Sequence, residues 1–148
     1  MVLLVVLSKK PWRGRSIQAA YKRMTPERFP VQVGQVKANV IAVLGLSVNE
    51  NNPILLGKSN IQHMTQSHPE DYARYGQYIG DILDSPDYVG INPKDNSIEY
   101  VKEFCINNEF VKVAVRISNS GTLYARSLYV LNTNRVRNFV KSGTLKKP

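Results

Sequence analysis

Arginine, tyrosine and histidine side chains in this sequence have the chemistry that phosphodiester cleavage requires. Arg116 and Arg126 lie on two segments that the pattern predicts as neighbouring strands, with Tyr124 between them. A guanidinium group binds two phosphate oxygens at once and stabilises the negative charge that develops during a reaction. His63 and His68 are the two histidines of the chain, and histidine commonly transfers protons near neutral pH. Together these residue types predict acid–base chemistry at a phosphate group.

RNA can be cleaved by such groups without a metal ion, because its ribose 2′-hydroxyl is an internal nucleophile. The reaction needs a base, an acid for the leaving oxygen and cations for the phosphate. His68 or His63 would be the acid or base, and Glu99 is a further candidate base. Tyr124 would stack on a nucleobase or contact the phosphate. We expect no metal and no cofactor, because one cysteine and two histidines provide neither a multi-cysteine cluster nor a purely histidine site.

Charge is distributed unevenly along the 148 residues, which carry 20 Lys+Arg and 11 Asp+Glu for a net charge of +9. Residues 59–110 contain nine acidic residues, whereas residues 111–148 contain eight Lys/Arg and none. Such an excess favours a polyanionic partner, either nucleic acid or an anionic membrane surface. The apolar run over residues 2–7 is too short to span a bilayer. We therefore expect an RNA partner and no membrane.

Periodicity and turn signals predict the elements that position these residues. Helices are expected over residues 17–24 and 38–46, from Ser59 to His68, and from Pro69 to the residues before Ser85. Short strands are expected over residues 29–36 and 54–56. Strands over residues 88–91, 97–106, 110–118 and 122–131 would form an antiparallel meander, followed by a helix over residues 134–141. This is an α+β domain with helices packed on a four-stranded antiparallel sheet and a short C-terminal helix.

The second hairpin of the meander decides which side chains share a face with the arginines. A three-residue loop at residues 119–121 places Arg116 directly opposite Tyr124. Lys112, Arg116 and Arg126 then lie on a polar face. Ser127 falls on the apolar face in this register.

The first hairpin places two carboxylates on the same polar face. A two-residue loop at residues 107–108 puts Glu99 opposite Arg116 and Glu103 opposite Lys112. Lys102 points to the apolar side in this register. The carboxylates can serve the site, or they can form cross-strand ion pairs that only stabilise the sheet.

Several runs of the sequence resemble one known superfamily. They are IQHMTQSHPEDY (61–72), ILDSPDY (82–88), SIEYVK (97–102), KVAVR (112–116) and YARSLY (124–129). Together, across residues 54–145, they resemble the phage-borne nuclease branch (PBECR) of the barnase–EndoU–colicin–RelE superfamily. The resemblance implies helices followed by a curved four-stranded antiparallel sheet. It also implies a metal-independent ribonuclease, commonly a toxin paired with an inhibitory protein.

The resemblance also implies site residues. His63 and His68 match the helix histidines of the superfamily, and Arg116 matches its strand arginine. Arg126 and Ser127 match the basic residue and the hydroxyl that follow on the next strand. Thr133 matches a hydroxyl near the end of the domain. The pairing of Arg126 with Ser127 conflicts with the register above, and a β-bulge near Ala125 would resolve the conflict.

The expected catalytic residues are His63, His68, Arg116, Glu99 and Ser127. The expected substrate-binding residues are Tyr124, Arg126, Lys112, Thr133 and Arg135.

We divide the chain into a basic N-terminal segment over residues 1–53, which can belong to the same domain, and a BECR-like nuclease domain over residues 54–148. The expected partners are an RNA substrate and an inhibitory antitoxin or immunity protein. The expected location is the cytoplasm, reached in a target cell or host by a phage or a secretion system if the protein is delivered. The sequence favours no particular oligomeric state.

Two other functions use the same features. A non-catalytic RNA- or DNA-binding module of a phage or mobile element would bind phosphates through the basic surface without cleaving them. A protein-interaction domain would instead dock through the acidic residues of the middle of the chain.

Overall fold

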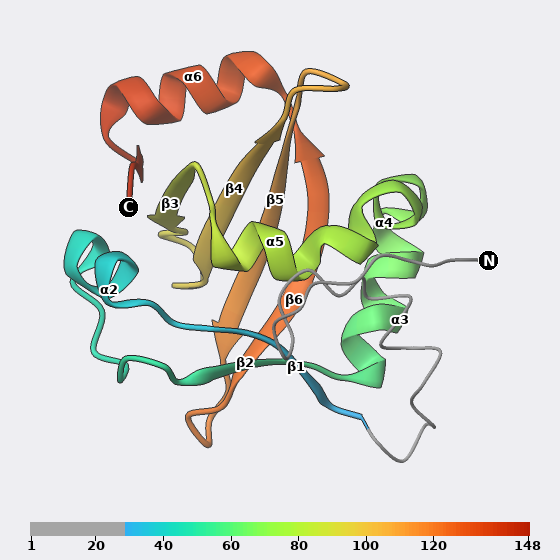
Figure 1. The fold of residues 1–148 in the computed structure, drawn as a ribbon, viewed down its shortest axis with the longest axis vertical. Helices are drawn as coiled ribbons and strands as arrows, with labels where there is room; N and C mark the ends of the chain where they lie inside the picture. The colour runs from blue at the N-terminus through green and yellow to red at the C-terminus, as the bar shows by residue number, and fades with distance from the viewer. Residues whose placement is uncertain (1–28) are drawn as a thin grey trace.

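A seven-stranded mixed β-sheet forms the frame of the computed structural model, which describes residues 29–148 (Figure 1). The strand order is β1-β2-β6-β5-β4-β3-β7. β2 runs parallel to β6, and the other neighbouring pairs are antiparallel. The strands are β1 (Val31–Gln35), β2 (Pro53–Leu56), β3 (Tyr88–Ile91), β4 (Ile98–Phe104), β5 (Glu109–Ile117), β6 (Leu123–Leu131) and β7 (Leu145–Lys146). The helices are α2 (Ala38–Leu44), α3 (Lys58–Ser67), α4 (Pro69–Tyr75), the 3-10 helix η2 (Gly76–Tyr78), α5 (Ile79–Asp84) and α6 (Thr133–Ser142).

The sheet is larger than the sequence predicts. The predicted meander is present as β3, β4, β5 and β6, but the prediction of a four-stranded sheet with helices ahead of it is wrong. β1 and β2 extend the sheet beyond β6, and β7 pairs with β3 at the opposite edge. Both added strands at the β6 edge precede α3, α4 and α5 in the chain. The α+β class is retained, while the helix expected over residues 17–24 lies outside the described residues.

The boundary between the two helices beside the histidines lies where the sequence predicts. The backbone N–H of His68 donates to the carbonyl of Met64 at the end of α3, at 3.0 Å, and α4 begins at Pro69. The expected single helix after Pro69 is instead divided into α4, η2 and α5. Gly76 lies at the division, where a Cβ would approach the ring of Tyr72 to 2.8 Å. The division lets α5 lie across the sheet (Figure 1).

Two apolar clusters lie on opposite faces of the central strands, because successive side chains of a strand alternate between faces. Tyr100 of β4, Val113 of β5 and Ile82 of α5 are fully buried in the larger cluster. The next residue of β4, Val101, packs with Val136 of α6 in the smaller cluster. α6 therefore covers one end of the face opposite α5. Polar side chains occupy the rest of that face.

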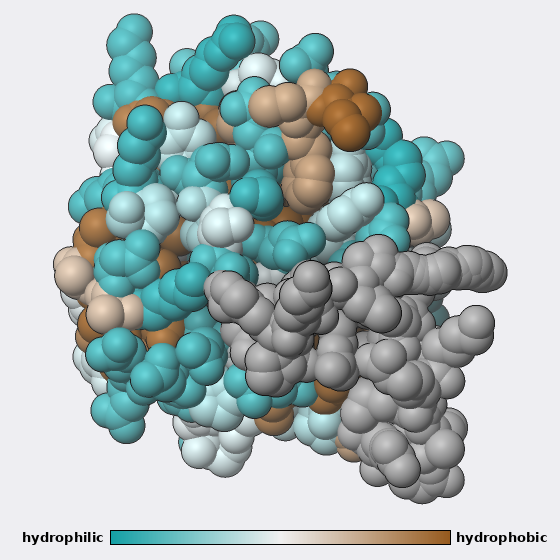
Figure 2. All heavy atoms as spheres, in the orientation of Figure 1, coloured by the Kyte–Doolittle hydropathy of each residue, from teal (hydrophilic) through white to brown (hydrophobic). Residues whose placement is uncertain are grey.

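The surface around α5 is mostly hydrophilic, and its apolar side chains form small separate areas (Figure 2). Within residues 29–148 the exposed large hydrophobic side chains are Tyr78, Ile106 and Ile117. No helix in this part of the chain has both the length and the apolar character needed to cross a bilayer.

Candidate active site

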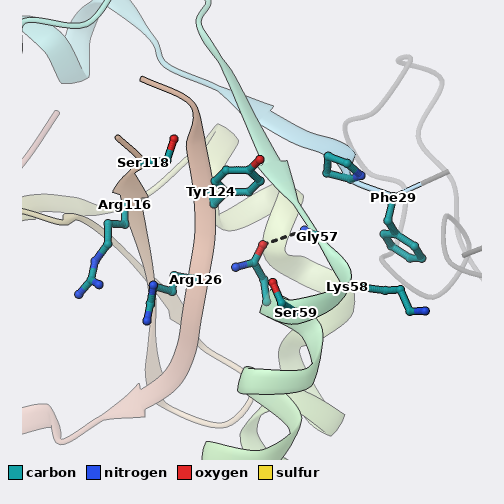
Figure 3. Close-up of a pocket in the computed structure, with 10 residues that line it drawn as sticks. Phe29, Gly57, Lys58, Ser59, Arg116, Ser118, Tyr124 and Arg126 are labelled. Carbon is teal, nitrogen blue, oxygen red and sulfur yellow. Dashed lines mark hydrogen bonds between the residues drawn. The ribbon is translucent and has the colours of Figure 1, made fainter. Parts of the chain in front are cut away.

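Two hollows meet at a pair of arginines on the face of the sheet opposite α5. Arg116 of β5 and Arg126 of β6 line both hollows, and their guanidinium groups extend in the same direction (Figure 3). The larger hollow has a volume of about 490 Å³ and the smaller about 280 Å³. The larger is also lined by Phe29, Pro30, residues 57–60, Ser118 and Tyr124. The smaller is also lined by His63, Asp95, Ser97, Ala114 and Ser127.

The turn between β5 and β6 determines how Arg116 and Tyr124 lie relative to each other. Residues 119–121 form the predicted three-residue loop, closed by the backbone hydrogen bond from Ser118 to Thr122, at 2.8 Å. Gly121 has a φ of 87°, a left-handed conformation that glycine adopts without strain. Arg116 then lies directly opposite Tyr124, as the sequence predicts.

A β-bulge in β6 determines the positions of Arg126 and Ser127. Ala114 pairs with Ser127 and Val115 pairs with Ala125, so Arg126 is the extra residue on β6. The predicted bulge near Ala125 is therefore confirmed. The prediction that Ser127 lies on the apolar face is wrong, because the extra residue moves every following side chain of β6 to the other face. Arg126 and Ser127 consequently line the same hollow.

His63 reaches the arginines from α3, which packs beside β6. The helix starts after Gly57, whose backbone N–H donates to the side-chain oxygen of Asn60 at 2.8 Å. Met64 of α3 is buried in the core, and the preceding side chain of His63 is exposed at the smaller hollow. The helix thus places an imidazole in the lining of the hollow that both arginines also line.

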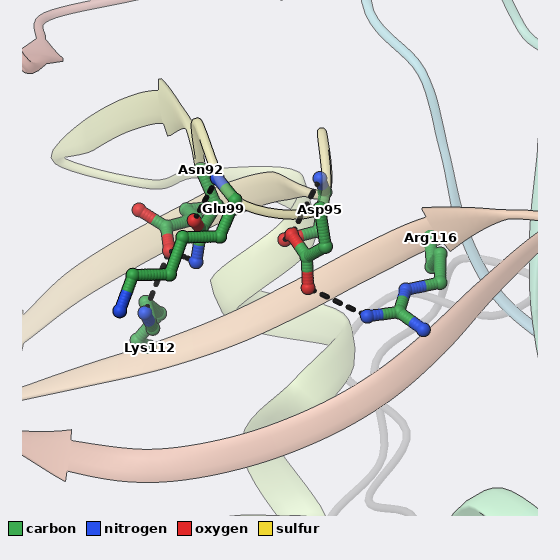
Figure 4. A network of polar contacts seen from close by, with 7 residues as sticks. Asn92, Asp95, Glu99, Lys112 and Arg116 are labelled. Carbon is green, nitrogen blue, oxygen red and sulfur yellow. Dashed lines mark hydrogen bonds and ion pairs between the residues drawn. The ribbon is translucent and has the colours of Figure 1, made fainter.

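Asp95 of the β3–β4 connection is a site residue that the sequence analysis missed. Its Oδ2 accepts a hydrogen bond from Nη2 of Arg116 at 2.6 Å (Figure 4). Its Oδ1 accepts from the backbone N–H and the hydroxyl of Ser97. The backbone bond from Ser97, followed by the bond from Arg116, lowers the pKa of Asp95 to about 2. Asp95 is therefore a carboxylate near neutral pH and holds Arg116 at the rim of the smaller hollow.

Arg116 has one buried donor that this ion pair leaves unsatisfied. Its Nε is buried and has no hydrogen-bond partner within the described residues. An unsatisfied buried donor costs about 1–3 kcal/mol, so it calls for an explanation. The carboxylate of Asp95 does not satisfy Nε, because one of its oxygens accepts from Nη2 of Arg116 and the other accepts from Ser97. Because Nε is closed to solvent, a phosphate at the hollows would meet the terminal nitrogens of Arg116, whose side chain is 39% exposed.

Glu99 and Lys112 form a separate buried pair next to the smaller hollow. Nζ of Lys112 lies 2.7 Å from Oε2 of Glu99, which also accepts from Asn92 at 3.3 Å (Figure 4). Burial alone would lower the pKa of Lys112, but its bonds to Glu99 and Tyr129 raise it overall. The ammonium group also lies 4.8 Å from the ring centre of Tyr129. Glu99 is therefore engaged by a cation rather than directed at Arg116.

The predicted partners of Glu99 and Glu103 are wrong. Glu99 lies opposite Ala114, and Glu103 lies opposite Phe110. The reason is that the β4–β5 connection spans residues 105–108 rather than two residues. A shift of two residues leaves each side chain on its predicted face. Lys102 does point to the apolar side, where its Nζ donates to the carbonyl of Ser85 at 2.8 Å.

Three other expected site residues line neither hollow. The ring of His68 stacks on Tyr129 with 4.7 Å between centroids. Thr133 and Arg135 lie in the first turn of α6, and the guanidinium of Arg135 lies 5.6 Å from the ring centre of Phe139. The hollows therefore bring together Arg116, Arg126, Tyr124, His63 and Ser127. Neither these three residues nor Glu99 and Lys112 line either hollow. Over residues 29–148, no group of three or more His, Cys, Asp or Glu side chains is arranged to hold a metal ion.

Replacing Asp95 by Asn is expected to tighten phosphodiester binding about two- to fivefold at low salt. The charge of Asp95 competes with phosphate for Arg116, and the lowered pKa keeps that charge present above pH 4 and removes it only as the pH falls through about 2. The gain should therefore be constant from about pH 5 to 8. Fluorescence titration with a non-cleavable 2′-deoxy oligonucleotide measures it.

The matched control is Glu50→Gln, which removes one exposed charge from a residue that lines neither hollow. It should change the affinity less than Asp95→Asn. Unchanged or weaker binding by Asp95→Asn would show that Asp95 positions Arg116 and does not compete with the ligand.

Comparison with known proteins places this α+β domain in the class of nuclease-like proteins. The sequence matches the family phage-Barnase-EndoU-ColicinE5/D-RelE like nuclease 3 (PBECR3) over residues 31–138. The chain belongs to this family, which confirms the resemblance seen in its motifs. The matched segment contains every residue that lines the smaller hollow. Searches of curated proteins and of solved structures found no match.

Proposed function

We propose that this protein is an endoribonuclease that cleaves RNA by attack of a ribose 2′-hydroxyl on the adjacent phosphate, without a metal ion. Membership of the nuclease-like family supports nuclease activity in general. One observation carries the finer proposal, namely that one imidazole, two guanidinium groups and the hydroxyl of Ser127 line the smaller hollow, beside the hydrogen-bonded pair of Asp95 and Ser97. These are the groups that the reaction needs for proton transfer and for charge on the phosphate.

Arg116 and Arg126 would hold the phosphate that is attacked. The position of both guanidinium groups at both hollows supports this role, because the side chain of Arg116 is 39% exposed there. Ser127 would add a hydrogen bond from the same strand as Arg126. Asp95 would give up its bond to Arg116 when the phosphate arrives.

His63 would transfer protons in the reaction. The 2′-oxygen loses its proton and bonds to phosphorus, while the bond from phosphorus to the 5′-oxygen breaks and that oxygen gains a proton. The products are a 2′,3′-cyclic phosphate and a 5′-hydroxyl. In the smaller hollow, Asp95 is the other titratable acid, and its pKa of about 2 makes it a weak base. His63 is therefore the better group to exchange protons near neutral pH.

A role as a phage or mobile-element effector, restrained by an inhibitory protein, is part of the proposal. The uneven charge of the chain supports it, because the basic surface that binds RNA is also a surface that an acidic inhibitor can cover.

Incubation of the full chain with RNA in excess chelator tests the proposed reaction. We expect the RNA to be cleaved and a DNA of the same sequence to remain intact, because DNA lacks the internal nucleophile. Intact RNA with tight, salt-sensitive binding would instead favour the non-catalytic nucleic-acid-binding module. A requirement for a divalent metal would contradict the proposed mechanism.

A further inference from the structure

The larger hollow offers hydrogen-bond donors to whatever it binds. Lys58, Arg116 and Arg126 line it, and their side chains can only donate. No carboxylate is found among the described residues of its lining. The oxygen of Ser118 already accepts from the backbone N–H of Thr122 at 3.1 Å. A ligand that presents acceptors fits this lining better than one that presents donors.

Asn60 contributes a donor whose orientation is fixed. Its side-chain oxygen accepts from the backbone N–H of Gly57 at 2.8 Å, and this bond determines which end of the amide faces the helix start. The amide nitrogen is left for a ligand, since it donates to no other described residue. Asn60 is half-buried and lines the larger hollow. The side chain therefore presents an NH₂ group rather than a carbonyl.

Tyr124 supplies an aromatic surface beside these donors. It lies opposite Arg116 on the neighbouring strand and lines the larger hollow. Aromatic side chains stack on nucleobases of unpaired nucleotides, which is worth about 1–3 kcal/mol per base. The volume of about 490 Å³ is in the range of small-ligand pockets.

We infer that the larger hollow is a subsite for one unpaired nucleobase that carries a keto group, with Asn60 as the residue that reads it and Tyr124 as its stacking surface. The inference rests on the proposed function, because it concerns the nucleotide next to the phosphate held by Arg116 and Arg126. Uracil, hypoxanthine and guanine present a keto oxygen where cytosine or adenine presents an amino group. A keto oxygen accepts from Asn60, whereas an amino group would face a second donor and leave both unsatisfied.

The test measures the affinity of the full chain for short, non-cleavable 2′-deoxy tetranucleotides. Deoxyuridine is compared with deoxycytidine, and deoxyinosine with deoxyadenosine, because each pair differs in the keto or amino group and in the adjacent ring nitrogen, which carries a hydrogen only beside the keto group. We expect the keto member of each pair to bind about tenfold more tightly. Equal affinities within each pair, or no binding of any tetranucleotide, would overturn the inference.

Asn60→Asp is the informative variant. Aspartate keeps an oxygen for the N–H of Gly57, so the start of α3 is preserved, but it presents a second acceptor where asparagine presents NH₂. The added charge weakens all the tetranucleotides together, so the readout is the ratio within each pair. We expect that ratio to fall to about one or to invert. A ratio that stays at the wild-type value would show that Asn60 does not read the base.

Tyr124→Ala separates stacking from reading. It should weaken keto and amino members alike, by about tenfold, and leave their ratio unchanged. Because these measurements use non-cleavable ligands, they are independent of the cleavage assay. Cleavage of RNA without a base preference in binding would refute the subsite and leave the proposed function standing. A base preference in binding without RNA cleavage would support the subsite and contradict the proposed function.

Discussion

Replacing Arg116 by alanine is expected to lower the rate of RNA cleavage by about 10³-fold. Arg116 lines both hollows, and its buried Nε has no partner within residues 29–148. The variant loses the cation on which charge would accumulate in the transition state. Lysine should restore little of the rate, because an ammonium group cannot bind two oxygens in the plane of a guanidinium. Single-turnover cleavage of a labelled RNA in chelator measures both variants.

The control must separate lost chemistry from lost structure and from lost net charge. Arg137→Ala removes the same charge from an exposed residue of α6 that lines neither hollow, and it should retain cleavage within about twofold. Thermal unfolding should be nearly unchanged for Arg116→Ala, whose side chain is 39% exposed. Full activity of a folded Arg116→Ala protein would remove Arg116 from the mechanism. In bacteria, toxicity that persists in this variant would speak against RNA cleavage as its cause.

His63→Ala is expected to lower the rate of RNA cleavage by about 10²–10⁴-fold, the range for loss of a general acid or base. The imidazole lines the hollow that contains both arginines, and the side chain is exposed there. Binding of a non-cleavable oligonucleotide should change much less than the rate, because the substitution removes a proton carrier rather than a phosphate contact. Parallel measurement of cleavage and binding gives both quantities for the same protein.

His68→Ala provides the matched comparison within the same helical segment. The ring of His68 stacks on Tyr129 and lines neither hollow, so its loss should reduce cleavage by less than about tenfold. A larger loss in His68→Ala than in His63→Ala would reverse the assignment. It would place the proton transfer at the end of α3, beside Tyr129 and Lys112.

Local signals in the sequence predict much of what positions the site. Pro69 marks the boundary between α3 and α4, because the residue before a proline is disfavoured in the helical region. The conflict between Arg126 and Ser127 predicts the bulge, since only an extra residue brings both to one face. Gly121 marks the left-handed end of the hairpin loop. These features depend on residues close together in the chain.

Features that depend on distant residues are not predictable in the same way. The apolar residues of β2 indicate a strand, but nothing in so short a segment indicates that it pairs in parallel with β6. The two-residue strand β7 carries no periodic signal at all. The cross-strand partner of Glu99 was missed because a two-residue and a four-residue loop between β4 and β5 place its side chain on the same face of the sheet. The two loops differ only in which residue of β5 lies opposite Glu99. The ion pair of Asp95 with Arg116 joins a loop to a strand 21 residues away.

The central claim is that the 2′-hydroxyl of the substrate is the nucleophile and that no metal ion takes part. The most direct test uses one RNA strand and a matched strand with a single 2′-deoxy nucleotide at the cleaved position, both in excess chelator. The account predicts cleavage of the all-ribose strand to a 2′,3′-cyclic phosphate and a 5′-hydroxyl, and no cleavage at the deoxy position. Cleavage at the deoxy position, or cleavage that appears only when a divalent metal is added, would contradict it.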